Sequence, residues 1–253
     1  MRNKSYYTEN NDKQPTRQRP KRRRLTLFDY FLYLVIAILL VVGIWILLKP
    51  QIDNRRRQVI SDDLVEILKN PPQIEASRGI WVDRDANRIP GESYDYQPPD
   101  NETNPTDRSE MIFIEPIAII QIDKINLANL PIMRGATNEN LRYGAALYTG
   151  TGSVEIPEPG QSTIFGHHMW EYGRHFNRLE ELDIGDTVRI IYQGKEYLYV
   201  VDRTTAVVPE KQIENIRKAR NENSILLITC KDPPEYPLRF LVFATLESVK
   251  SIQ

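Results

Sequence analysis

Ile225-Leu-Leu-Ile-Thr-Cys230 is an apolar, β-branched run that ends in the only cysteine of this 253-residue chain. A second apolar run, Phe240-Leu-Val-Phe-Ala244, follows directly on Arg239. Both runs have the length and composition of strands. Because Cys230 closes the first run, just before the charged and rigid Lys231-Asp-Pro-Pro234, we expect its thiol at the rim of a sheet.

Short strand-like runs separated by turns fill the chain from residue 111 onward. This texture predicts an all-β fold, a closed or nearly closed β-barrel of seven to eight strands with short helices. Helices are expected near Asn138–Tyr143 and Arg174–Leu182, and Gln193-Gly194 predicts a tight hairpin turn. The expected strands are Ile117–Ile122, Leu130–Met133, Thr163–Phe165, Thr187–Tyr192, Glu196–Val201, Ile225–Thr229 and Arg239–Leu246.

An apolar segment, Leu25–Leu48, precedes this region and carries no charge from Phe31 onward. A helix needs about 20 apolar residues to cross a bilayer. A buried core helix would show a polar stripe, and a signal peptide would end in small residues; this segment has neither feature. We therefore expect an uncleaved, single-pass signal anchor. The larger basic cluster before it, Arg17–Arg24, predicts a cytoplasmic N-terminus and an extracellular remainder.

Four regions are expected along the chain. Residues 1–24 form a basic cytoplasmic tail, 25–48 the anchor, 49–110 an extracytoplasmic helix and polar linker, and 111–253 the barrel domain. In the third region, Val59–Leu68 has helical periodicity with a cap at Ser61-Asp-Asp63, and a proline-rich stalk follows. The formal net charge of −1 gives no global basic field that would indicate nucleic acid as a partner.

The chain combines a lone thiol with a cluster of imidazoles, because its three histidines are His167, His168 and His175. Together with Arg239, these are the groups needed to break and remake an amide bond. Each of these residues could also have a purely structural role. Cys230 could be a core residue, His167 a solvated histidine in a turn, and Arg239 a solvated arginine at a strand end. A free thiol outside the cytoplasm has no structural partner, which favours a reactive Cys230.

A zinc site at the histidines is a further alternative. Zinc needs a coherent set of ligands, and the nearby Glu171 and Glu180 do not complete a recognised spacing. No metal site is therefore predicted from these residues.

Three blocks together resemble the sortases, the cysteine transpeptidases that anchor proteins to Gram-positive cell envelopes. Thr163–His168 is similar to the family's strand ending in Gly-His, Leu227–Cys230 to its Leu-x-Thr-Cys strand, and Leu238–Ala244 to its arginine-led last strand. The order and spacing of the blocks agree as well, and the resemblance spans roughly residues 115–247. Leu226 stands where the family often has threonine, a variation within the strand.

The resemblance implies a catalytic set of His167, Cys230 and Arg239, with His168 outside it. Cys230 is expected to cleave an LPXTG-like sorting signal between Thr and Gly through a thioacyl-enzyme intermediate. His167 then acts as general acid and base, and Arg239 stabilises the oxyanion. The implied partners are secreted proteins with such C-terminal signals and the amine of the peptidoglycan precursor lipid II. No cofactor is expected; Glu155 and Glu158 do not support the calcium site of some members.

Two other functions remain as alternatives. The chain shows no trailing hydrophobic segment and no Asp-Pro-aromatic lid before the barrel, which favours a single-anchor housekeeping, class A-type sortase over a pilin-polymerising one. A membrane-anchored β-barrel binding module without chemistry predicts instead a buried, inert Cys230. A papain-like protease places its cysteine early, at a helix start, whereas here His167 comes first.

Overall fold

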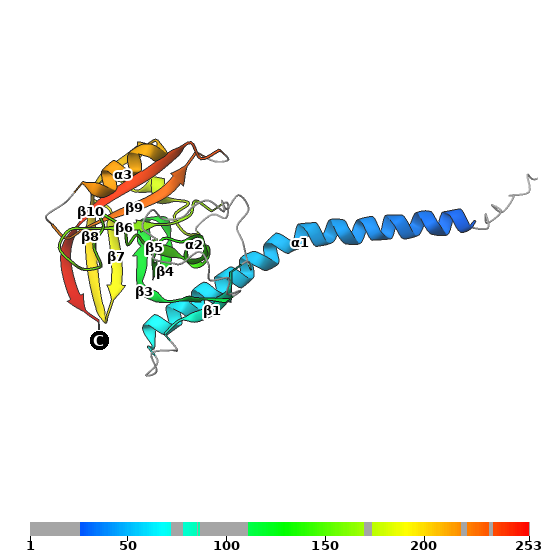
Figure 1. Cartoon of the computed structure of the whole chain (residues 1–253), viewed down its shortest axis with the longest axis horizontal. Helices are drawn as coiled ribbons and strands as arrows, with labels where there is room; N and C mark the ends of the chain where they lie inside the picture. Colours follow the sequence, from blue (N-terminus) through cyan, green and yellow to red (C-terminus); the bar gives the residue numbers. More distant parts are fainter. Residues whose placement is uncertain are drawn as a thin grey trace, which may run out of the picture. The chain divides into compact units, whose positions relative to one another are not determined.

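The structure is a computed structural model, and it describes residues 26–71, 78–84, 86, 111–169, 174–218, 222–232 and 235–252. The chain forms two compact units, Met1–Lys49 and Pro50–Gln253. Figure 1 follows the elements of both units along the chain.

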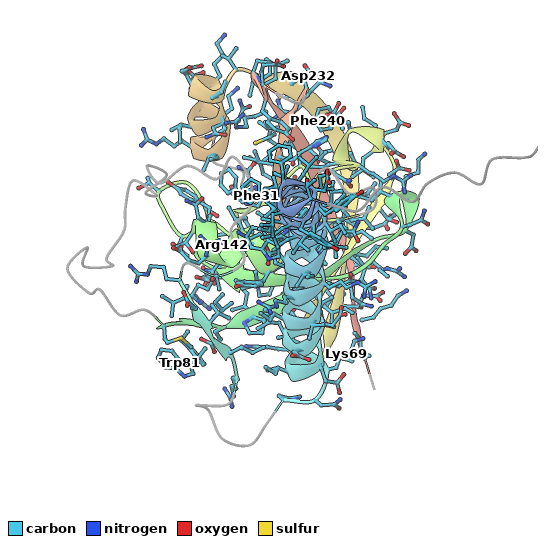
Figure 2. The ribbon with its side chains drawn as sticks, turned by 90° about the vertical axis from the view of Figure 1, so that its right-hand side faces the viewer. Phe31, Lys69, Trp81, Arg142, Asp232 and Phe240 are labelled. Atoms are coloured by element: carbon cyan, nitrogen blue, oxygen red, sulfur yellow. The ribbon has the colours of Figure 1, made fainter. Side chains whose placement is uncertain are left out.

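The first element is a 43-residue helix, α1 (Leu27–Lys69), which contains Pro50. Thr26 caps its start, because the Asp29 carboxylate accepts from the Thr26 N–H at 2.7 Å and the Asp29 N–H donates to Thr26 Oγ1 at 3.3 Å. The part before Pro50 exposes apolar side chains such as Phe31 (Figure 2). Within the described ranges, α1 is the one helix long and apolar enough to cross a membrane. It therefore fits the expected anchor, and its orientation stays a prediction.

The helix predicted from Val59 is the last part of α1 and has no start of its own. Its predicted cap, Ser61–Asp63, lies inside the helix. The stretch between the span and Val59 is rich in Gln and Arg, which favour helix, so the helix continues through it. The helix ends where the proline-rich stalk was expected to begin: α1 ends at Lys69, two residues before Pro71, and proline disfavours helix in the residue preceding it.

Eight strands close into a barrel in the order β10-β8-β7-β3-β4-β5-β6-β9, which confirms the predicted all-β barrel. Neighbouring strands are antiparallel, except that β4 pairs with β5 and β6 with β9 in parallel. The strands are β3 (Pro116–Ile122), β4 (Leu127–Arg134), β5 (Ala145–Leu147), β6 (Gln161–Phe165), β7 (Thr187–Tyr192), β8 (Lys195–Val207), β9 (Ser224–Lys231) and β10 (Leu238–Ser251).

The hairpin turn predicted between β7 and β8 is confirmed. Gln193 and Gly194 both have positive φ, 47° and 71°, as the two central residues of a type I′ turn require. Tyr192 and Lys195 pair directly on either side of the turn.

The short helix α2 (Asn138–Tyr143) lies where it was predicted, with Thr137 Oγ1 accepting from the Asn140 N–H at 3.2 Å as its N-cap. A further helix, α3 (Pro209–Arg217), begins with proline in its first turn and was not predicted. The helix predicted over Arg174–Leu182 is wrong, because only a 3₁₀ turn, η3 (Leu179–Glu181), forms there.

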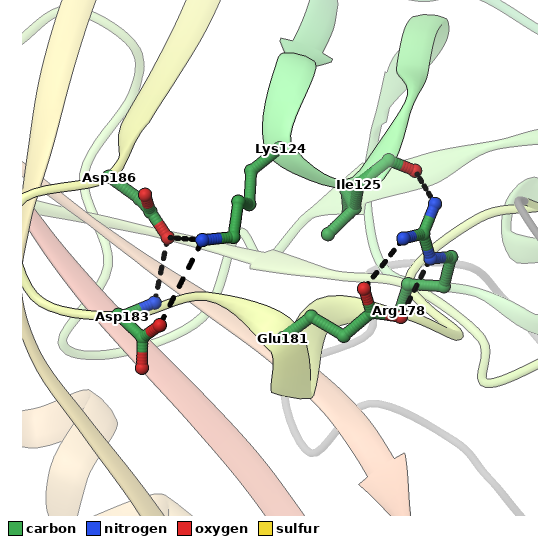
Figure 3. A network of polar contacts seen from close by, with 6 residues as sticks. All are labelled: Lys124, Ile125, Arg178, Glu181, Asp183 and Asp186. Carbon is green, nitrogen blue, oxygen red and sulfur yellow. Dashed lines mark hydrogen bonds and ion pairs between the residues drawn. The ribbon is translucent and has the colours of Figure 1, made fainter.

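Backbone geometry and ion pairs explain why no longer helix forms in that stretch. His175 has φ +49° and forms a β-bridge with His168, which is incompatible with a right-handed helix. Arg178 then binds Glu181 at 2.7 and 2.6 Å and the Ile125 carbonyl at 2.8 Å (Figure 3). Ile125 belongs to a second 3₁₀ turn, η2 (Asp123–Ile125), so the hydrogen bond from Arg178 links the two turns.

Buried side chains divide between the two faces of the strands. All eight barrel strands contribute to one cluster, the barrel interior, to which β9 gives Ile225 and Leu227. The alternate residues Leu226 and Ile228 join an outer cluster with Leu141 of α2 and Ile216 of α3. Because successive strand side chains point to opposite faces, β9 is buried on both sides, and each aliphatic side chain stabilises the fold by about 1.5–3 kcal/mol.

A third cluster lies at the N-terminal side of the barrel. β1 (Ile80–Asp83) pairs antiparallel with β2 (Met111–Ile114), and their inward side chains pack with Leu64 of α1, Met133 of β4 and Tyr143 of α2. The part of α1 after Pro50 therefore packs against the strands and α2 as part of the second unit. The remainder of the expected stalk, including Tyr94 and Tyr96, lies outside the described residues.

Candidate active site

Cys230 and Arg239 face each other across neighbouring strands. They are direct partners in the antiparallel β9–β10 register, near the end of both strands where Asp232 and Phe240 are labelled in Figure 2. Side chains that are directly opposite in an antiparallel pair have Cβ atoms about 4.5–5.5 Å apart. The register alone therefore brings the thiol and the guanidinium together.

His167 follows β6, which pairs with β9 along the edge opposite to β10. The last pair of the parallel β6–β9 ladder is Phe165 with Ile228, and the Gly166 N–H donates to the Ile228 carbonyl at 3.0 Å. β6 ends at Phe165; extended by two residues, the same register sets His167 opposite Cys230. The central strand β9 thus carries the cysteine between the histidine and the arginine.

The three side chains also share one face of the sheet. Phe165, Ile228 and Leu241 lie in one row across β6, β9 and β10 and all pack in the outer cluster. His167, Cys230 and Arg239 each stand two positions from a member of this row, and residues two apart on a strand point to the same face. By this alternation the three predicted site residues fall on the outer face of the barrel, where β6 and β9 end and β10 begins; their catalytic role stays a prediction.

The thiol of Cys230 is half-buried and not sealed in the core. Burial raises its pKa, while the positive charge of Arg239 acts in the opposite direction. The Nη1 of Arg239 donates to the backbone carbonyls of Tyr236 and Leu238, both at 3.0 Å. These bonds hold a permanent positive charge where it favours a thiolate or an oxyanion.

The pKa of the His167 imidazole is shifted in the opposite direction to that of the Cys230 thiol. Burial, and then the charges of Arg142 and Arg57, lower its pKa to about 4. Its Nε2 is buried, and among the described residues it has no hydrogen-bond partner. With a raised thiol pKa and a lowered imidazole pKa, the resting pair is a neutral thiol and a neutral imidazole.

The loop that carries His167 is held by its neighbour Phe176. The Phe176 N–H donates to the His167 carbonyl at 3.1 Å, and the Phe176 ring is fully buried in the barrel interior. A Cβ on Gly166 would lie 2.4 Å from Phe176 Cδ2, closer than real Cβ contacts come. The glycine before His167 is therefore required by the ring beneath it.

Gly166→Ala should accordingly lower both stability and activity. The added methyl group forces Phe176 or the His167 backbone to move, and overpacking of this kind costs about 1–3 kcal/mol. Urea unfolding and the turnover rate measure the two effects. Gly185→Ala is the control: a Cβ there meets no atom within 4 Å although φ is +95°, so it adds backbone strain without the clash. Equal turnover for Gly166→Ala and wild type would contradict this role.

His168 and Tyr236 form the rim beside the three residues. Their rings lie 5.8 Å apart, and the Tyr236 hydroxyl donates to the His168 carbonyl at 3.4 Å. Burial and the negative charge of the Cys230 thiolate both raise the pKa of Tyr236, so the phenol lies within electrostatic reach of the sulfur. Tyr236 was not identified from the sequence, where only its place between two strands was visible.

Two of the carboxylates considered for metal binding form ion pairs, and Glu171 lies outside the described residues. Glu155 pairs with Arg134, and Glu180 pairs with Lys231. Over the ranges that the structure describes, no three His, Cys, Asp or Glu side chains gather as metal ligands would. The prediction that the protein needs no metal or cofactor stays a prediction.

Comparison with known proteins gives consistent matches. A family model for the sortase domain matches residues 120–247, that is 128 of 253 residues. The chain is 25% identical over 238 residues to sortase A of Streptococcus agalactiae serotype III, covering 90% of each chain. It is 30% identical over 129 residues to sortase D of Bacillus subtilis, which is 49% of this chain and 61% of that one.

Solved structures give further matches over the barrel. Sortase A of Listeria monocytogenes aligns with a TM-score of 0.48 and 24% identity, over 55% of this chain and 91% of that one. Sortase C-1 of Actinomyces oris aligns with a TM-score of 0.48 and 29% identity, over 53% and 75%.

Proposed function

The chain belongs to the sortase family of cysteine transpeptidases, and from this membership we propose that it joins secreted proteins to the cell wall. In this proposal the enzyme cleaves an LPXTG-like sorting signal between Thr and Gly. It then transfers the new C-terminus to an amine of the peptidoglycan precursor lipid II. The observation that supports the proposal most is the strand register: Cys230 pairs directly with Arg239, and β6, which ends two residues before His167, pairs with β9 on its other edge.

The first half of the reaction forms a thioester. The Cys230 thiolate attacks the carbonyl carbon of the signal's threonine, and the negative charge that develops on the carbonyl oxygen is stabilised by the fixed charge of Arg239. The Thr–Gly C–N bond then breaks while protonated His167 gives its proton to the departing glycine amine. The enzyme is left with an acyl group on sulfur and a neutral imidazole.

The second half restores the enzyme. Neutral His167 takes a proton from the incoming amine, whose nitrogen attacks the thioester carbonyl. The C–S bond breaks, an amide forms, and Cys230 leaves as a thiolate beside the newly protonated imidazole.

We propose further that the catalytic unit lies outside the cell and is tethered by α1, with residues 1–24 in the cytoplasm. The larger basic cluster before the span supports this orientation. Clients with a C-terminal hydrophobic anchor would then share the membrane surface with the enzyme, which raises their effective concentration.

The test is a product analysis with the full chain in lipid nanodiscs. We expect mass spectrometry to find cleavage after Thr in LPXTG-like peptides, and an amide to a lipid II-type amine when that amine is present. Cleavage at another bond, or no amide with any amine, would contradict the proposal. Preferential joining to a pilin lysine peptide would instead identify a pilin-polymerising enzyme and refute the housekeeping assignment.

A further inference from the structure

We propose that Arg57, on the part of α1 that packs against the barrel, is a positioning residue that acts on His167, so that the segment before the barrel is part of the active site. The inference rests on the proposed function, because it takes His167 as the acid and base of the reaction. Arg57 belongs to a run of three arginines, Arg55–Arg57, which the sequence presents only as charges following the span.

Arg57 lies on the buried face of α1. It precedes Ile60 and Leu64 by three and seven residues, the spacing of one helix face, and those two residues pack in the N-terminal cluster. Arg57 is 3% exposed, whereas Arg55 and Arg56 are exposed. Its Nη2 donates to Asn54 Oδ1, one turn earlier. Of the three arginines, only Arg57 is therefore buried within the second unit.

A second buried arginine belongs to α2. Arg142 of α2 is also 3% exposed, and it directly precedes Tyr143, which shares the N-terminal cluster with Leu64. Its Nη1 donates to the Arg84 carbonyl and, at 3.4 Å, to the Ala86 carbonyl in the turn after β1. The N-terminal elements thus hold Arg142 in place, and Figure 2 labels it on α2.

Strand register brings His167 to the same place. In the antiparallel β5–β6 pair Ala146 faces Phe165; extended by two residues, this register sets His167 opposite Gly144, just after Arg142 and Tyr143. Gly144 is closely packed, because a Cβ there would lie 2.3 Å from the Pro131 carbonyl oxygen. The imidazole therefore approaches the end of α2, the element that α1 packs against.

The electrostatics agree with this placement. The charges of Arg142 and Arg57 both add to burial in lowering the pKa of His167, and Arg57 also lowers that of buried His175. The ring of His175 lies 6.5 Å from that of His167. Arg174, on the same loop, also lowers the pKa of His175, after burial and the charge of His167. Two buried arginines on elements outside the strands disfavour imidazolium at His167.

This arrangement restrains the reaction. Catalysis needs protonated His167 together with the Cys230 thiolate, yet the imidazole pKa lies below the thiol pKa. At pH values between these two pKa values, only a small fraction of the enzyme holds a thiolate together with an imidazolium. Each pKa unit between the thiol and the imidazole lowers this fraction about tenfold. Removing the charge of Arg57 should raise the pKa of His167, narrow the separation and enlarge the productive share.

The experiment compares Arg57→Met and Arg57→Gln with wild type, as full chains in nanodiscs. Methionine keeps an unbranched stem against the helix face, and glutamine keeps a hydrogen-bond donor, so that one neutral variant suffices if the other fails to fold. NMR of ¹³C-labelled histidine follows His167 directly, because the chain has only three histidines. The pH profile of kcat/KM reports the same group through its acid limb.

We expect the His167 titration and the acid limb to move to higher pH by about half a unit to one unit. Turnover near pH 7 should rise about three- to tenfold, following the same separation of pKa values. Arg57→Lys should resemble wild type, because it keeps the charge. Arg56→Met is the matched control, since it removes an equal but exposed charge and should leave the profile in place.

An unchanged His167 titration in both neutral variants would overturn the proposal. So would an equal shift in Arg56→Met, because the effect would then come from net charge and not from the buried position. If wild type proves unable to join peptide and amine, the proposed function fails, but the NMR titration still decides whether Arg57 acts on His167.

Discussion

Cys230→Ala is expected to abolish peptide cleavage and amine joining together. The substitution removes the atom that forms the thioester, and loss of a nucleophile of this kind lowers turnover by more than about 10³-fold. The loss should appear at every pH, because no other thiol exists in the chain. Turnover of an LPXTG-like peptide, followed by chromatography, measures it.

The same substitution should leave the fold intact. Cys230 is half-buried at the end of β9, where a smaller side chain leaves no enclosed cavity, so the unfolding midpoint should change little. The half-buried thiol of Cys230 is also expected to label with a thiol reagent in the folded protein. Slow labelling combined with unchanged turnover in Cys230→Ala would contradict the proposed role.

His167→Ala is the second large effect, and His168→Ala is its matched control. Removing the His167 imidazole takes away both the proton donor for the glycine amine and the acceptor for the incoming amine. General acid and base catalysis contributes about 10²–10⁴-fold in enzymes, so a loss of this order is expected. Steady-state kinetics with a peptide and an amine give the comparison.

His168 is expected to matter far less. Its ring packs on Tyr236 at 5.8 Å, and its backbone carbonyl, which alanine keeps, accepts the tyrosine hydroxyl. We therefore expect His168→Ala to retain most of the wild-type rate. A His168→Ala enzyme as inactive as His167→Ala would refute the assignment of the imidazole.

The barrel was predictable from the sequence, whereas the catalytic roles of the three site residues stay predictions. Each strand run such as Ile225–Thr229 carries its own β-branched pattern, and Cys230 and Arg239 mark the ends of two such runs. Their pairing follows from closure of the sheet. The local hairpin turn at Gln193-Gly194 was predictable for the same reason, since its signal lies within two residues.

Other features depend on contacts that no local pattern encodes. β5 has only three residues, too few for a periodic signal, yet its register places His167 beside the end of α2. Arg57 precedes His167 by 110 residues, and only the packing of α1 on the N-terminal cluster separates it from exposed Arg56. The expected helix at Arg174–Leu182 failed because His175 takes a left-handed backbone conformation that its sequence does not announce.

The most direct measurement is the intact mass of the full-length enzyme after brief reaction with an LPXTG-like peptide in the absence of an amine, followed by peptide mapping. We expect a mass increase equal to the signal up to its threonine, attached through a hydroxylamine-sensitive bond to the peptide that contains Cys230. An adduct on another residue, or rapid product formation with no adduct at any time, would contradict the account.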